Sequence, residues 1–90
     1  MVVAAKIIDP TLAEVDFLRC ELRTGLTLTK IALDARHHDK TSRNRANARK
    51  AYDAVLRFIP KVNLSDSESA EFTSKLQQLK SELALLGEEI

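Results

Sequence analysis

The sequence has few of the residues that interrupt helices or cross-link chains. Its 90 residues include one cysteine, two glycines, two prolines and no tryptophan. A single cysteine excludes an internal disulfide and is typical of a reducing compartment, so we expect Cys20 to be a small buried apolar residue. With 44% hydrophobic and 30% charged residues, the chain is too apolar to be disordered. We expect one folded domain that spans residues 1–90.

Two further absences limit the location and the partners. No apolar run approaches the roughly 20 residues that a membrane-spanning helix needs, and Lys6 interrupts the apolar start of the chain. The sequence therefore predicts a cytoplasmic protein with no membrane partner. The formal net charge of +1 provides no overall field that would attract nucleic acid or an anionic membrane.

A first helix is expected at about residues 11–36, starting at Pro10 and Thr11. Gly25 within it allows either a bend or the close approach of a neighbouring backbone. Its apolar residues recur at helical spacing on two faces, so it needs more than one partner. One face contains Leu12, Val15, Leu22, Leu26, Thr29 and Leu33, and the other contains Phe17, Cys20, Leu28, Ile31 and Ala35.

Two more helices follow after short loops. The second is expected at about 42–59, from a cap at Thr41 or Ser42 to the residue before Pro60. The third is expected at about 66–86, because Ser65 and Glu68 form a capping box and Gly87 suits a left-handed cap. Short loops make sequential helices antiparallel neighbours. The predicted fold is all-α, a three-helix antiparallel bundle with residues 1–8 as an extension.

A short pattern in the second helix resembles a known repeat. In "ARKAYDAVLRFIP", Ala48, Tyr52, Val55 and Pro60 stand at relative positions 0, 4, 7 and 12. This resembles the second helix of a tetratricopeptide repeat, which implies a helical hairpin packed through these residues and followed here by a third amphipathic helix. The chain also resembles small bacterial helical proteins, a likeness that implies no function.

The second helix also begins in a basic segment. Residues 36–50 contain six Lys or Arg and one Asp, whereas residues 64–90 contain six acids and two lysines. Cations at a helix start oppose the helix dipole and would favour an anion there. The candidate binding residues are Arg43, Arg45, Arg49 and Lys50. Three counterparts stay open: the third helix of the protein itself or of a second copy, an acidic protein or peptide, and nucleic acid.

Other chemistry has little support in the sequence. His37, His38 and Asp39 form the one cluster that could ligate a metal, but adjacent histidines at a helix end point in different directions, so we expect a solvated turn and no metal. No nucleophile elbow or glycine-rich phosphate loop is present, so we expect neither a cofactor nor enzymatic activity.

The function that the sequence favours is a small interaction module that self-associates. The first helix has more apolar perimeter than two other helices can readily cover, and such excess usually indicates a partner. Phe17, Leu28 and Ile31 are the candidate self-association residues, in a homodimer or against another protein with an apolar or acidic surface. Nucleic-acid or anion binding by the start of the second helix is the alternative.

Overall fold

The fold consists of three helices in the computed structural model, which describes residues 10–36 and 38–90. Helix α1 spans Pro10–Asp34, α2 spans His38–Phe58, and α3 spans Asp66–Leu85, with a short 3-10 helix η2 at Ile59–Lys61 after α2. No strand occurs in these two segments. The all-α prediction is confirmed. The predicted extension at residues 1–8 lies outside the described residues.

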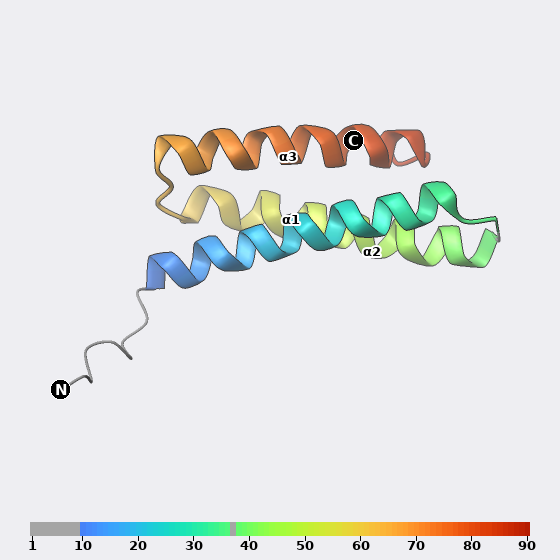
Figure 1. The fold of residues 1–90 in the computed structure, drawn as a ribbon, viewed down its shortest axis with the longest axis horizontal. Coiled ribbons are helices and arrows are strands. Elements are labelled where there is room, and N and C mark those ends of the chain that lie inside the picture. Colours follow the sequence, from blue (N-terminus) through green and yellow to red (C-terminus); the bar gives the residue numbers. More distant parts are fainter. Residues whose placement is uncertain (1–9, 37) are drawn as a thin grey trace.

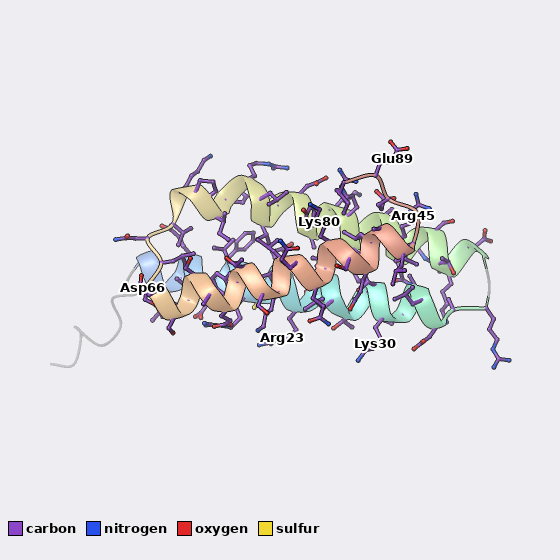
Figure 2. All side chains as sticks on the ribbon, turned by 90° about the horizontal axis from the view of Figure 1, so that it is seen from above. Arg23, Lys30, Arg45, Asp66, Lys80 and Glu89 are labelled. Carbon is purple, nitrogen blue, oxygen red and sulfur yellow. The ribbon has the colours of Figure 1, made fainter. Side chains whose placement is uncertain are left out.

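Helix α2 runs antiparallel to both α1 and α3, as the prediction of an antiparallel bundle requires (Figure 1). Figure 2 shows α3 lying over the groove between α1 and α2, and Figure 1 shows it on one side of that pair. No helix of the described chain covers the opposite side. This one-sided arrangement decides which surfaces of α1 and α2 remain accessible.

The core lies where the three helices meet. Its fully or almost fully buried members come from every helix: Val15, Leu18 and Leu22, then Ala48, Tyr52 and Val55, then Phe72, Leu79 and Leu83. The second helix thus buries Ala48, Tyr52 and Val55, the three residues that carry the repeat-like pattern, although family membership stays a prediction. Leu18 was not expected in either apolar face of the first helix, yet it is fully buried.

Gly25 explains how α1 passes close to both partners. Helix α1 is continuous through it. A Cβ added to Gly25 would lie 2.8 Å from Leu79 Cδ2 and 3.4 Å from Ala51 Cβ. The atoms closest to Gly25 are thus side-chain atoms of α3 and α2, and an added methyl group would meet a buried leucine.

Thr29 is the buried polar residue of α1. Its hydroxyl lies 3.0 Å from the carbonyl oxygen of Leu26 and also hydrogen-bonds to the carboxylate of Glu82 on α3. The side-chain amide of Gln78 donates to the other oxygen of Glu82 at 3.0 Å. Because a buried hydroxyl without a partner would be costly, this link makes Thr29 compatible with the apolar face on which it was predicted.

The prediction for the start of α2 is wrong by about four residues. The helix begins at His38, and α1 already ends at Asp34, so the connection is shorter than expected. The hydroxyl of Thr41 donates to the carbonyl oxygen of Ala32 at 3.4 Å, which ties α2 to the end of α1. Asp39 in the first turn of α2 suits the positive end of the helix dipole.

Both predicted caps of α3 are confirmed. The backbone N–H of Glu68 donates to the hydroxyl of Ser65 at 3.1 Å, and the backbone N–H of Ser65 donates to the Glu68 carboxylate at 2.9 Å. At the other end Gly87 has φ 98°, and the N–H of Glu88 donates to the carbonyl of Leu83 at 2.9 Å. This Schellman geometry turns the chain back toward α2.

Candidate interaction surface

Two of the four predicted binding residues, Arg45 and Arg49, already have an internal partner. The guanidinium of Arg45 pairs with one carboxylate oxygen of Glu88, and Arg49 Nη1 donates to the other at 3.0 Å. Arg45 and Arg49 also donate to the carbonyl oxygens of Gly87 (3.3 Å) and Glu89 (3.2 Å). Figure 2 shows the segment after α3 lying over α2 near Arg45. The acidic counterpart within the chain is Glu88, which lies beyond the end of α3 and not on the third helix as expected.

The hydrogen-bonded charges around this contact shift the pKa values of Glu88 and Arg49. Hydrogen bonding from Arg45, and then from Arg49, lowers the pKa of Glu88. Hydrogen bonding to Asp53, at 3.0 Å within α2, raises the pKa of Arg49. Each shift favours the charged form. An external anion would therefore have to displace Glu88 from these arginines.

Arg43 and Lys50 differ from the other two predicted residues. Both are exposed, and neither forms an ion pair with any part of the chain that the structure describes. Seven residues separate them on α2, which is two helical turns, so they share one face. The four candidate residues thus divide into an internally occupied pair and a pair available to a partner.

An aromatic contact lies between α1 and the end of α2. The rings of Phe17 and Phe58 meet edge to face with centroids 5.6 Å apart, although the residues remain 45% and 37% exposed. They line a cavity of about 500 Å³ with Ala13, Glu14, Lys61 and Val62. Lys61 Nζ and Arg57 Cζ lie 5.6 Å and 5.9 Å from the centre of the Phe58 ring. The contact is an apolar surface with a basic rim.

The three candidate self-association residues do not form one patch. Leu28 is half-buried and packs against the core, whereas Ile31 is 41% exposed. Ile31 lines a separate groove between α1 and α3, of about 290 Å³, together with Arg23 and Lys30. Of the three, Phe17 is therefore the exposed residue that contacts α2, through Phe58.

An ion-pair network that the sequence did not predict joins α1 to α3. Arg19 donates to both carboxylate oxygens of Glu71 at 3.0 Å, and Lys75 lies 3.2 Å from the same carboxylate. These hydrogen bonds, first from Arg19 and then from Lys75, lower the pKa of Glu71 from 4.5 to about 2. The Arg19 guanidinium also lies 5.5 Å from the centre of the Phe72 ring. Sequence spacing could suggest the Glu71–Lys75 pair, but not the link to α1.

Two other expectations concern Cys20 and the histidines. Cys20 is exposed, so the prediction of a buried residue is wrong. His37 and the side chain of His38 lie outside the described residues. Elsewhere no group of three His, Cys, Asp or Glu side chains could hold a metal ion. No helix of the described segments is long and apolar enough to cross a membrane.

Comparisons with models of known protein families, with curated proteins and with solved structures gave no match to this chain.

Proposed function

We propose that the protein is a cytoplasmic, non-enzymatic interaction module that self-associates through the outer surface of α1. Phe17 carries this proposal, because a phenylalanine that remains 45% exposed beside an aromatic partner and a cavity is suited to a protein contact. Aromatic side chains contribute much of the binding energy at such surfaces.

The distribution of exposed apolar side chains gives further support. Among the residues whose exposure the structure describes, half of the large ones belong to α1, although α1 makes the most extensive contacts inside the bundle. Those described are Leu12, Phe17, Ile31, Leu33, Leu56, Phe58, Leu85 and Ile90. Neighbouring exposed apolar groups favour a partner, whereas isolated ones are ordinary on a protein surface.

Self-association can be tested with two substitutions of equal starting exposure. Phe17 and Leu56 are each 45% exposed, but Leu56 adjoins α3 and lies away from the Phe17–Phe58 contact. In sedimentation equilibrium over a wide concentration range, we expect a dimer that Phe17→Ser weakens and Leu56→Ser leaves unchanged. A wild-type protein that remains monomeric at several hundred micromolar would contradict the proposal.

Anion or nucleic-acid binding by the start of α2 is the second candidate, favoured by the exposed and unpaired state of Arg43 and Lys50 in the described structure. Affinity for a labelled oligonucleotide should then fall steeply with salt, because bound cations release counterions from the phosphates. Replacing Arg43 and Lys50 by glutamate should abolish binding. Absence of binding by the wild-type protein at low salt would exclude this candidate.

A further inference from the structure

The side of the α1–α2 pair opposite α3 carries charges of opposite sign on its two helices. The contacts of α3 define this side: Arg19 and Thr29 face α3 from α1, and Arg45 and Arg49 face the segment after α3 from α2. At 100° per residue, two rows of side chains lie on the other side of the two helices.

The row on α1 is acidic and follows steps of three and four residues. Its members are Glu14, Phe17, Glu21, Thr24 and Leu28. Neither Glu14 nor Glu21 forms an ion pair with any described residue, and Glu14 is exposed beside Phe17 in the cavity wall. We call this set the acidic row.

The row on α2 and η2 follows the same steps and is basic from Arg43 onward, and one acid, Asp39, lies one turn before Arg43 on the same face. Its members are Arg43, Asn47, Lys50, Ala54, Arg57 and Lys61. All four of its cations are exposed, and none is paired with an acid in residues 10–36 or 38–90. We call this set the basic row.

Three observed contacts fix how the two rows align. The Phe17 and Phe58 rings touch, Gly25 adjoins Ala51, and Thr41 bonds to the carbonyl of Ala32. Along an antiparallel pair the residue number rises on one helix as it falls on the other, so the numbers of two facing residues have a nearly constant sum. The three contacts have this property. Glu14 therefore lies at the level of Lys61, and Glu21 at the level of Ala54, between Lys50 and Arg57.

We propose that two copies of the chain pack face to face through these rows, around a two-fold axis parallel to the helices. This axis keeps each residue at its level and places α1 of one copy on α2 of its partner. Glu14 then faces the partner's Lys61, and Glu21 lies within one helical turn of the partner's Lys50. The inference rests on the proposed self-association and specifies its geometry.

The alternative face-to-face dimer has its axis perpendicular to the helices. That axis would place each acidic row on the acidic row of the partner, and each basic row on the other basic row. Like charges in direct opposition disfavour such an association. The charges therefore select the arrangement in which α1 lies on α2 of the partner.

The size of the face is compatible with a reversible dimer. About 20 residues of helix at 1.5 Å each span about 30 Å, and two adjacent helices are about 20 Å wide, so each copy would bury about 600 Å². The total of about 1,200 Å² is at the low end for specific protein interfaces. A concentration-dependent dimer is the expected state.

Charge reversal distinguishes the two arrangements. One variant reverses the acidic row by Glu14→Lys and Glu21→Lys, and a second reverses the basic row by Lys50→Glu and Lys61→Glu. In the homodimer of either variant, like charges face each other at both contacts between α1 and the partner's α2. Dimerisation should therefore weaken by more than about tenfold. When the two variants are mixed in equal amounts, their heterodimer has opposite charges at both of these contacts. Sedimentation equilibrium should therefore show a dimer again.

Matched controls carry the same charge changes away from the face. Asp34→Lys with Glu89→Lys matches the first variant, and Lys30→Glu with Lys80→Glu matches the second. All four positions are exposed, and Figure 2 shows Lys30 and Glu89 at opposite edges of the bundle. These controls should dimerise as the wild type does, and circular dichroism confirms that every variant is folded.

The outcomes separate this inference from the proposed function. If both row variants dimerise like the wild type and mixing them changes nothing, the face is overturned while self-association stands. If both variants dimerise like the wild type but their mixture dimerises more strongly, the axis is perpendicular, because that axis places the reversed row of each variant on a row of opposite charge in the other. A monomeric wild type would refute both.

Discussion

Replacement of Gly25 by alanine tests the close approach of the three helices. A helix interior gains about 1 kcal/mol when glycine becomes alanine. Here the new methyl group would lie 2.8 Å from Leu79 Cδ2, and Leu79 is fully buried, so it can retreat only by displacing other core residues. Overpacking costs about 1 to 3 kcal/mol, so the net change should be a loss of up to about 2 kcal/mol.

The sign of the effect should reverse when the obstacle is removed. Leu79→Ala alone should cost about 2 to 5 kcal/mol because it leaves a cavity. In that background the methyl group at residue 25 has space, so Gly25→Ala should stabilise the protein by about 1 kcal/mol. The difference between the two backgrounds is the coupling energy of a double-mutant cycle.

Urea denaturation followed by circular dichroism measures all four free energies of unfolding. Thr24→Ala, one residue away on the exposed side of α1, is the control, and it should gain a few tenths of a kcal/mol from helix propensity alone. If Gly25→Ala stabilised the wild type by the full 1 kcal/mol or so expected for an open helix position, the close approach would be refuted.

Three further predictions concern ionisation, a turn and the thiol. Because the folded-state pKa of Glu71 is about 2 and its ordinary value is 4.5, its pairing with Arg19 stabilises the fold above pH 4.5 and is lost as the pH falls toward 2. Denaturant midpoints should therefore fall in that window, and less steeply for Glu71→Gln. Gly87→Ala should cost about 1 kcal/mol in the same denaturation assay, because alanine is strained at φ 98°. Cys20 should react with a thiol reagent in the native protein at nearly the rate in denaturant, and strong protection would contradict its exposed position.

The caps of α3 could be predicted because their causes are local. Ser65 and Glu68 satisfy each other's backbone groups within one turn, and Gly87 adopts a conformation that few other residues tolerate. Neither depends on where α1 lies. The start of α2 could not be predicted in this way, because the hydroxyl of Thr41 bonds to Ala32 on the preceding helix, nine residues earlier, and does not cap α2.

The faces of α1 show a different limit. Apolar residues occur on two sides of this helix, so periodicity alone does not decide which side packs inward. Leu18 is buried and Cys20 is exposed, although the sequence favoured a buried cysteine and overlooked the leucine. The position of α3 settles the choice, and that position depends on contacts at Gly25 and Thr29 that act between helices.

The basic segment shows that the fold decides which charged residues have a partner. Along the sequence, Arg43, Arg45, Arg49 and Lys50 form one group of cations. Folding separates them, because the Schellman turn at Gly87 brings Glu88 onto the side of α2 that contains Arg45 and Arg49, and not onto the side that contains Arg43 and Lys50. On the side that α3 does not cover, Lys61 lies at the level of Glu14, and Lys50 and Arg57 lie on either side of the level of Glu21. Since each sign occupies its own helix, a second copy can neutralise both rows at once, which a partner of uniform charge cannot do.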